Sequence, residues 1–323
     1  MKTTKITSGL IVLSLFISLF ILSGCATTIR VPVTRPAEIN LRGINKIAIG
    51  EIKGDGGQTI ADLLSSKLFE SQKFEVVDRA HIQQVMAEHK LNKSGIVDEK
   101  TALQLGKYVG AAVLVFGNVS LNKYEQKMSK ANPWRDKEGG RHQTHYIKGT
   151  AKLTTTLQVI GLNTGKVLAS KTISKTAENT NSADNGWPEE PDKDALMSAT
   201  VNDAVNAFIK MIAPYRDYES VTFAKKDSDL PELEKCESFA KMGRWNDAVE
   251  QAKIATQKNP TNVGAWWNLG ICYQFSYMFT EAESAFNEAY KIKPEEKYLI
   301  QISQVKRLAS ERKRLDEQGE LQK

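Results

Sequence analysis

The stretch "VGAAVLVFGNV", residues 109–119, is the most informative segment for the fold. From Ala111 to Val119 nearly every residue is apolar, whereas a strand with one solvated face would alternate apolar and polar residues. This nearly continuous apolar run predicts a β-strand that is buried on both faces. Such a strand belongs inside a sheet, with neighbouring strands on either side.

The segments before this run alternate between strands and helices. An apolar stretch at 47–52 predicts a first strand, and apolar residues at helical spacing predict a helix over 58–71. The sequence "FEVV", residues 74–77, predicts a second strand, and Asp78 is suited to cap the helix that follows it. A further helix is predicted over 99–108.

The segments after the run predict a hairpin and a long helix. Residues 151–161 alternate apolar and polar side chains, and the turn signal "NTG" separates them from a returning strand at 167–176. The polar residues 177–194 predict a loop, which is followed by an amphipathic helix that ends before Pro214. For residues 44–215 these elements predict an α/β sandwich, with helices on a mixed sheet of about five strands.

The loop after the first strand, "KGDGGQ" at 53–58, invites comparison with glycine-rich loops that hold phosphate groups. It matches neither common spacing of such loops, because no Gly-Lys-Ser/Thr follows and no glycine lies three residues after Gly56. Asp55 would also repel a phosphate group. We therefore interpret the loop as a turn between strand and helix and expect no cofactor.

Residues 1–24 are predicted to be a signal peptide. Two lysines precede an apolar block of 13 residues, 10–22, whereas a membrane-spanning helix needs about 18. The block ends in "LSGC", which resembles the lipobox of bacterial lipoproteins. The resemblance implies that cleavage leaves Cys25 first, carrying diacylglycerol and an N-acyl chain such as palmitate. The alternative is an ordinary signal peptide that contains a cysteine.

The lipobox also sets an expectation for location and charge. Ala26, in place of aspartate, favours the outer membrane, with the protein facing the periplasm. Residues 25–43 contain two prolines and no sustained period, so we predict a tether. Loss of two lysines with residues 1–24 leaves 42 of the 44 basic residues against 38 acidic ones, a net charge of +4. Because these charges are interspersed, we expect no nucleic-acid partner.

The order of elements and several short motifs are similar to those of the CsgG family of curli secretion lipoproteins. The motifs lie within residues 44–215 and accompany the lipobox; they are "FEVVDR", "AEHKL", "VGAAVLVFGNV" and "GLNTGKVL". The resemblance implies the family's α/β fold and an outer-membrane lipoprotein that acts in assembly or secretion. It is the main reason to expect a role in the cell envelope.

The same resemblance implies a rival function. Members of the family insert two hairpins per subunit into the outer membrane and assemble a ring-shaped channel. The matching regions here are 119–150 and 170–192. Membrane strands need about nine to eleven residues with one apolar face, but Lys123, Glu125 and Lys127 share one face and the other face is polar as well. We therefore keep the channel subunit as an alternative.

Few side chains form a pattern that supports catalysis or metal binding. His142 and His145 have Asp136 and Glu138 nearby, but the spacing supplies no further converging ligand. No nucleophile motif is present. Two other histidines border a predicted helix and are interpreted as structural or surface residues: His81 and His89. We predict no catalytic or metal site, and the remaining enzymatic alternative is a hydrolase whose site is unrecognised.

The C-terminal part is predicted to contain tetratricopeptide (TPR) repeats over 229–262 and 263–296, with a capping helix to residue 317. The first repeat is degenerate, with Cys236 and Ala252 at two signature positions. The second matches the pattern at eight positions: Trp266, Leu269, Gly270, Tyr273, Ala282, Phe286, Ala289 and Pro294. The whole chain is thus predicted to be an α/β domain followed by an all-α repeat domain.

TPR modules bind peptide segments or helices along the concave surface formed by their first helices. By register, the second repeat would line this groove with Trp267, Asn268, Ile271, Gln274 and Phe275. Such an apolar patch with two aromatic residues suits a partner. The alternative is that Trp267 or Phe275 packs inside the protein.

Cys236 and Cys272 lie on apolar faces of predicted helices, where free cysteines behave as small hydrophobic residues. An oxidising compartment would also permit a disulfide between them, so both states stay open.

We therefore predict a non-catalytic adaptor that helps to assemble or regulate an envelope complex. The expected partners are the outer membrane, through the lipid on Cys25, and a periplasmic or outer-membrane protein. Assembly into a homo-oligomer is a further expectation. The channel subunit and the unrecognised hydrolase remain the alternatives.

Overall fold

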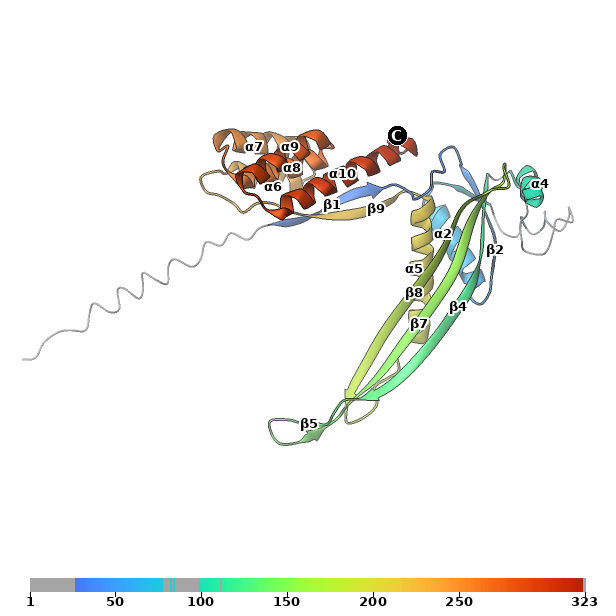
Figure 1. Ribbon diagram of the computed structural model, residues 1–323. Coiled ribbons are helices and arrows are strands. Elements are labelled where there is room, and N and C mark those ends of the chain that lie inside the picture. The colour runs from blue at the N-terminus through green and yellow to red at the C-terminus, as the bar shows by residue number, and fades with distance from the viewer. Residues whose placement is uncertain (1–26, 78–81, 83, 85–98, 111, 322–323) are drawn as a thin grey trace, which may run out of the picture. The chain divides into compact units, whose positions relative to one another are not determined.

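The computed structural model describes residues 27–77, 82, 84, 99–110 and 112–321 (Figure 1). Cys25, the predicted signal peptide and nearly all of the helix predicted after Asp78 lie outside these residues. The chain divides into two compact units. The first, here called the sheet unit, joins Pro36–Tyr215 with Glu317–Lys323. The second, the helical unit, joins Met1–Arg35 with Arg216–Asp316.

A mixed sheet of five strands organises the sheet unit, as the sequence predicted. Its strand order is β3-β2-β4-β7-β8. The pairs β2/β3 and β2/β4 are parallel, and β4/β7 and β7/β8 are antiparallel. The strands are β2 (Lys46–Lys53), β3 (Glu75–Val77), β4 (Val113–Lys130), β7 (Thr144–Gly161) and β8 (Val167–Asp184).

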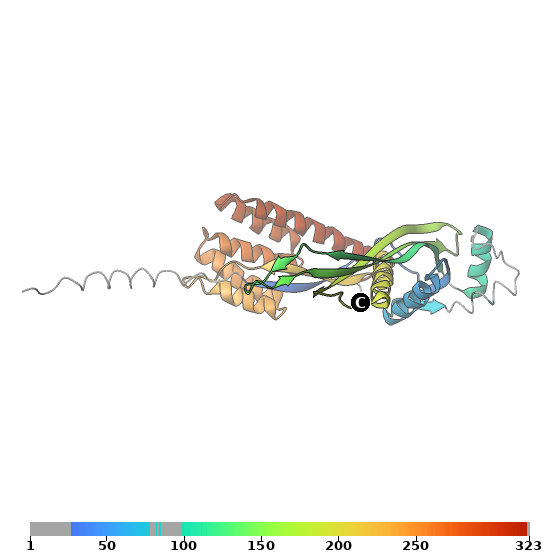
Figure 2. The ribbon, with the colours of Figure 1, turned by 90° about the horizontal axis from the view of Figure 1, so that it is seen from below.

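Helices cover both faces of the sheet at its base. α2 (Gly57–Glu70) and α5 (Lys193–Ile212) lie on one face, and both pack into the main core (Figures 1 and 2). α4 (Glu99–Val109) contributes Ala102 and Leu105 to a second core, which contains Leu114 of β4. The neighbours Val113 and Val115 belong to the main core instead. The prediction that this strand is buried on both faces is therefore confirmed for Val113–Val115, whereas Asn118 farther along it is exposed.

The glycine loop makes a tight turn from β2 into α2. Gly54 and Gly56 have φ values of +92° and +77°, which favour glycine. A Cβ atom on Gly57, the first residue of α2, would lie 2.0 Å from the carbonyl oxygen of Ile52. The spacing of these glycines is thus explained by a close chain reversal.

The strands β4, β7 and β8 are each 18 residues long and continue well past α2 (Figure 1). We call their far ends, residues 121–130, 144–154 and 174–184, the extension. The loop predicted over 177–194 is wrong in its first part, because residues 177–184 pair with β7 from Ala151 to Thr144. Cross-strand hydrogen bonds hold this polar segment in a strand although it lacks an apolar period.

The tip of the extension carries a short hairpin of β5 (Trp134–Arg135) and β6 (Arg141–His142). The segment "RHQTH", predicted as a loop, therefore lies mainly in β6 and the start of β7.

The prediction of a tether over 25–43 is also wrong for its described part. Residues Thr28–Arg35 form β1, which pairs with β9 (Tyr215–Thr222) in a two-stranded sheet. Val31 and Val221 of these strands are buried in the core of the helical unit. In the sheet unit, Ala37 and Leu41 are buried as well. The partner strand lies nearly 190 residues away in sequence, so no local sequence pattern predicts this strand pairing.

Among the described residues, five helices complete the helical unit, and α6 to α9 pack in sequence order (Figures 1 and 2). A Cβ atom on Gly270 would lie 2.6 Å from Cε1 of Phe286, so α8 and α9 approach closely at this glycine. None of the helices in the described part of the chain has the length and apolar character that crossing a membrane would require. The helices are α6 (Glu232–Lys241), α7 (Trp245–Lys258), α8 (Val263–Phe275), α9 (Phe279–Ile292) and α10 (Glu296–Glu317).

Candidate functional site

The predicted groove lies on α8, but the structure does not leave it open. Asn268, Ile271, Gln274 and Phe275 are buried, and Trp267 is half-buried. The five residues do lie together on one side of the helix, in or beside the core of the helical unit. The prediction that they form a free surface for a partner is corrected by this burial.

The chain segment that follows β9 covers this face. The indole Nε1 of Trp267 donates a hydrogen bond of 2.8 Å to the carbonyl oxygen of Thr222. Two residues later, the backbone N–H of Ala224 donates one of 2.8 Å to Oδ1 of Asn268. Between them, the side chain of Phe223 is only 1% exposed in the apolar core. An extended piece of the protein's own chain thus occupies the place predicted for a partner peptide.

α10 closes the face from another side. Tyr298 is 1% exposed and meets Trp267 edge to face, with ring centroids 5.6 Å apart. Nε2 of Gln301 donates a hydrogen bond of 2.7 Å to Oε1 of Gln274. The open alternative, that Trp267 and Phe275 pack inside the protein, is therefore the observed one.

Sequence reasoning overlooked Phe223, the residue that fills this face. A usable signal exists in "SVTFA", residues 220–224, where Val221 and Phe223 alternate with polar residues. That alternation predicts a strand end with one buried face, although it does not say which helix covers it.

A charged cluster ties β1, β9 and α10 together. The Arg35 guanidinium contacts Asp217 at 3.3 Å, Glu311 at 2.5 Å and also Glu219, and its side chain is 9% exposed. Arg307 reaches Glu219 from α10 at 2.6 Å. Burial by itself would raise the pKa of Glu219, but the hydrogen bonds from Arg35 and Arg307 outweigh it and lower the pKa. The charged groups of this cluster are paired with one another, so the cluster stabilises the contact between β1, β9 and α10.

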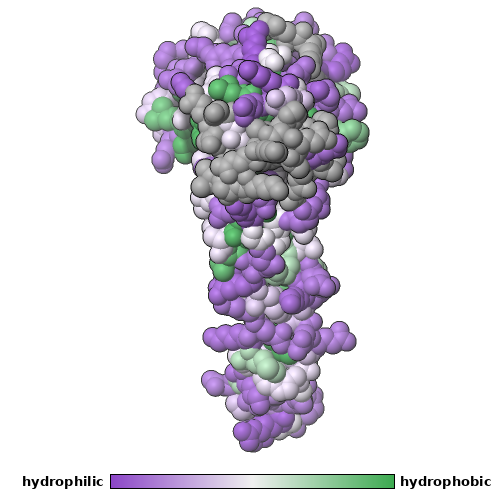
Figure 3. Space-filling model, turned by 90° about the vertical axis from the view of Figure 1, so that its right-hand side faces the viewer, coloured by the Kyte–Doolittle hydropathy of each residue, from purple (hydrophilic) through white to green (hydrophobic). Residues whose placement is uncertain are grey.

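One face of the extension is polar and exposed to solvent. Near its base, hydroxyl groups pair across β7 and β8, as in Thr154 with Ser174 at 3.1 Å. Farther out, Lys152 contacts Glu125 at 2.9 Å and Lys148 contacts Glu178 at 2.6 Å. On the face shown in Figure 3, the extension is mostly hydrophilic with a few isolated hydrophobic residues.

Four lysines and three acidic residues share this face, so its charges nearly balance: Lys123, Lys127, Lys148, Lys152, Glu125, Glu178 and Asp184. Hydrogen bonds from Lys123 and Lys152 lower the pKa of Glu125 to about 2, so it stays ionised.

The opposite face of the extension is covered by the protein's own chain. Ile147, Ala151 and Leu153 are buried there. Nδ2 of Asn181 donates a hydrogen bond of 2.9 Å to the carbonyl oxygen of Glu189, which holds the segment after β8 against the strands. The extension therefore has one solvated polar face and a second face that is covered along β7, whereas Met128 of β4 on that second face is exposed.

The candidate metal ligands at the tip have other partners. Nε2 of His142 donates to Oδ2 of Asp136 at 2.6 Å, which lowers the pKa of Asp136, while Nδ1 accepts from Asn185 at 3.0 Å. His145 instead meets Trp187 edge to face at 4.8 Å. The described residues contain no group of three or more His, Cys, Asp or Glu arranged to hold a metal ion.

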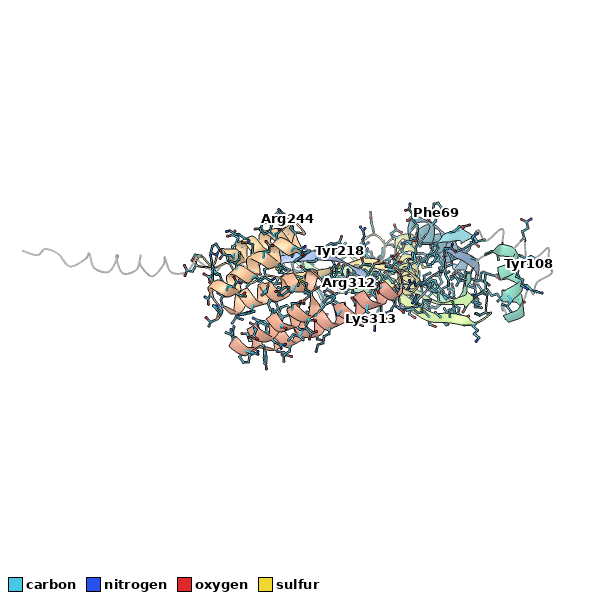
Figure 4. The ribbon with its side chains drawn as sticks, turned by 90° about the horizontal axis from the view of Figure 1, so that it is seen from above. Phe69, Tyr108, Tyr218, Arg244, Arg312 and Lys313 are labelled. Atoms are coloured by element: carbon cyan, nitrogen blue, oxygen red, sulfur yellow. The ribbon has the colours of Figure 1, made fainter. Side chains whose placement is uncertain are left out.

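Exposed aromatic side chains elsewhere do not combine into a patch. Phe69 on α2 and Tyr108 on α4 are 74% and 51% exposed, and they project from different parts of the sheet unit (Figure 4). Tyr218 of β9 is exposed and has the guanidinium carbon of Arg30 4.7 Å from its ring centroid. Scattered exposed aromatics of this kind are ordinary for a protein surface.

Comparison with known families decides where this fold belongs. A model of the family "Curli production assembly/transport component CsgG" matches residues 45–237, which is more than half of the chain. The chain belongs to the CsgG family. The matched region contains the whole five-stranded sheet, including the extension. No curated protein matches this sequence.

Several solved structures are similar at low identity. The PelC dodecamer from Paraburkholderia phytofirmans is 14% identical, with a TM-score of 0.30, 57% of this chain and 97% of that chain covered. Lipoprotein GNA1162 from Neisseria meningitidis is 11% identical, with a TM-score of 0.30 and coverage of 51% and 97%. The LpoB C-terminal domain from Escherichia coli is 11% identical, with a TM-score of 0.27 and coverage of 41% and 83%. TM-scores this low do not support a functional comparison.

Proposed function

We propose that this CsgG-family protein is a non-catalytic adaptor that helps to assemble or regulate a complex of the cell envelope. In this proposal it is an outer-membrane lipoprotein, anchored through Cys25 and facing the periplasm. Family membership supports the envelope setting. The observation that carries the choice of an adaptor is the polar, solvated face of the extension.

The polarity of this face argues against contact with lipid. A lysine at the centre of a bilayer costs roughly 2–4 kcal/mol, and four lysines lie on this one face. Their glutamate partners and the hydroxyl pairs near the base leave no apolar band along the strands. The face suits water and a polar protein partner, because it carries four lysines and three carboxylates.

The channel subunit remains a second candidate because of strand length. Three strands of 18 residues exceed the roughly nine to eleven that a membrane strand needs. In that function the segment after β8 would have to leave the buried face of Ile147 and Leu153. The lysine face would then line a water-filled interior, and the uncovered face would meet lipid.

We further propose that α6 to α9 are two TPR repeats and that α10 caps them. The burial of Leu269, Ala282, Phe286 and Ala289 supports this, since these signature positions should face the helix pair. In the proposed repeats the concave side is already filled by Phe223. A partner of the adaptor is therefore expected on the extension, or on the groove only after this segment leaves.

Oligomer size and vesicle integrity separate the two functions. The lipidated protein, extracted in mild detergent, is compared with a soluble form that starts at Ala26, by mass photometry and by dye release from liposomes. The adaptor is expected to stay a small oligomer and to leave vesicles tight. A uniform ring of the lipidated form that releases dye would overturn the adaptor and favour the channel.

Site-specific photo-crosslinking in cells tests for the partner directly. A photoreactive residue at Thr180, on the exposed face of the extension, is expected to capture a protein other than this chain. A matched residue at Glu250, an exposed position of α7, serves as the control. Adducts of equal yield at both positions, or none at Thr180, would contradict the extension as the docking face.

A further inference from the structure

Two cysteines meet in the core of the helical unit although they are 36 residues apart in sequence. Cys236 lies on α6 and Cys272 on α8, and their Sγ atoms are 3.0 Å apart. Both side chains are fully buried, in the core that also contains Phe223 and Leu269. Both are free thiols in this structure.

The surroundings exclude the other common uses of a cysteine pair. A structural metal site needs four ligands, and among the described residues no third His, Cys, Asp or Glu joins these two. A catalytic thiol needs solvent access and a lowered pKa, whereas burial, followed by the contact with Cys236, raises the pKa of the Cys272 thiol. What remains is either packing of two free thiols as small apolar side chains or a bond between the two sulfur atoms.

The geometry requires only a small movement for that bond. A disulfide has an S–S distance of about 2.05 Å, so the sulfurs need to approach by roughly 1 Å. The two cysteines sit on helices that already pack against each other.

We propose that Cys236 and Cys272 form an intramolecular disulfide that links α6 to α8 in the mature protein. The two thiols lose two protons and two electrons to the disulfide of a dithiol–disulfide oxidoreductase, which leaves as a dithiol. In cells the reaction rests on the proposed location outside the cytosol, where such oxidants act. The link closes a loop that contains all of α7.

The order of folding and oxidation follows from the burial. The attacking species in disulfide exchange is a thiolate, but the raised pKa of Cys272 disfavours its thiolate, and burial of both cysteines excludes an oxidant. Oxidation therefore occurs before α6 and α8 close over the pair. Once formed, the disulfide is shielded from small reductants by its burial. It holds α6 against α8, the helix that binds the segment around Phe223.

Refolding under oxidising conditions tests the bond itself. The soluble form that starts at Ala26 lacks Cys25, so Cys236 and Cys272 are its only cysteines. The protein is refolded from urea with glutathione disulfide, then alkylated in denaturant and weighed by mass spectrometry. No alkyl group is expected on the refolded monomer, and two are expected after reduction. Two alkyl groups on refolded monomer would overturn the proposal.

A thermal scan gives a readout that depends on the link within the fold. Reduction is expected to lower the melting temperature of the oxidised protein by roughly 5–10 °C, because the unfolded chain loses a constraint. The double variant Cys236→Ala, Cys272→Ala is the control and should melt at the same temperature with and without reductant. An equal shift in this variant would assign the effect to the reductant and contradict the link.

The same mass measurement on protein from cells separates the two proposals. A thioether-linked Cys25 does not react with the alkylating reagent, so an exported, lipidated chain with the disulfide carries no alkyl group. Two alkyl groups on a lipidated chain would overturn the disulfide and leave the location intact. A reactive Cys25 would overturn the lipid anchor, while the refolding result still decides the disulfide.

Discussion

The side-chain Oδ1 of Asn268 accepts a hydrogen bond of 2.8 Å from the backbone N–H of Ala224. Asn268 is fully buried, so this bond satisfies a backbone donor that has left β9 and is shielded from water. A second hydrogen bond, from the indole Nε1 of Trp267 to the carbonyl oxygen of Thr222, also contacts this segment. Together the two bonds fix an extended segment on the face of α8. The helical unit thus binds a part of its own chain in the way the sequence predicted for a partner.

Removing the amide of Asn268 should destabilise the helical unit. We expect Asn268→Ala to lower the free energy of unfolding by about 1–3 kcal/mol, because the N–H of Ala224 loses its acceptor in a buried place. Urea unfolding measures the change. Asn246→Ala, at an exposed position of α7, is the control and should stay within about 0.5 kcal/mol of the parent protein. Equal effects of the two substitutions would show that the hydrogen bond from Ala224 to Asn268 does not stabilise the helical unit.

Phe223 should be the main anchor of the segment. Phe223→Ala removes a side chain that is 1% exposed, and such substitutions cost roughly 3–5 kcal/mol. Phe223→Leu keeps most of the volume, so it should fold and lose less. Tyr218→Ala, which removes an exposed ring of β9, is the control. Calorimetry that ranked Tyr218→Ala with Phe223→Ala would show that the segment is not anchored through its aromatic residue.

Arg35 should matter more than an ordinary surface arginine. Arg35→Met leaves the carboxylates of Glu219 and Glu311 without their buried partner, and we expect a loss of roughly 2–4 kcal/mol. Arg244→Gln breaks an exposed contact of 2.6 Å with Asp247 (Figure 4), which is worth about 0–1 kcal/mol. Denaturant titrations of both variants give the comparison. If Arg35→Met were as stable as Arg244→Gln, the charged cluster would not stabilise the contact between β1, β9 and α10.

The same cluster predicts a loss of stability in acid. The folded-state pKa of Glu219 lies below the ordinary value of 4.5, so its carboxylate stabilises the folded protein above that pH. This contribution is lost as the pH falls through the lowered pKa. Melting temperatures between pH 6 and 3 should therefore fall less steeply in Glu219→Gln than in the parent protein. Glu250→Gln, an exposed change of equal charge, should keep the parent slope, and a slope unchanged in Glu219→Gln would refute the linkage.

Cys25 should determine the membrane association of the protein. Cys25→Ser removes the thiol that would carry the lipid, so we expect the chain to move from the membrane fraction to the periplasmic extract. Metabolic labelling with palmitate, followed by fractionation, measures both effects. Cys272→Ser should keep the label and the membrane fraction. A Cys25→Ser chain that still carried label would place the lipid elsewhere.

Regular elements with a strong apolar period were predicted well from sequence. The run at 111–119 and the helix at 58–71 match β4 at its base and α2, because each buries its apolar residues against nearby elements. The five-stranded mixed sheet follows from the same kind of signal. The groove residues were placed correctly on one helix, but the residues that cover them were not found.

The sequence by itself determined where apolar faces form, and hence the α/β class, the helical C-terminal part and the kinship with the CsgG family. Only the tertiary structure decided the fate of the polar segments. Residues 177–184 are a strand because β7 pairs with them, and Thr28–Arg35 are a strand because β9 does. Likewise, Phe223 and its neighbours cover the face of α8 that carries Asn268. The physical reason is that strand pairing and the burial of single side chains depend on residues far away in the chain. An apolar period, in contrast, is a property of consecutive residues and can be recognised in a short segment.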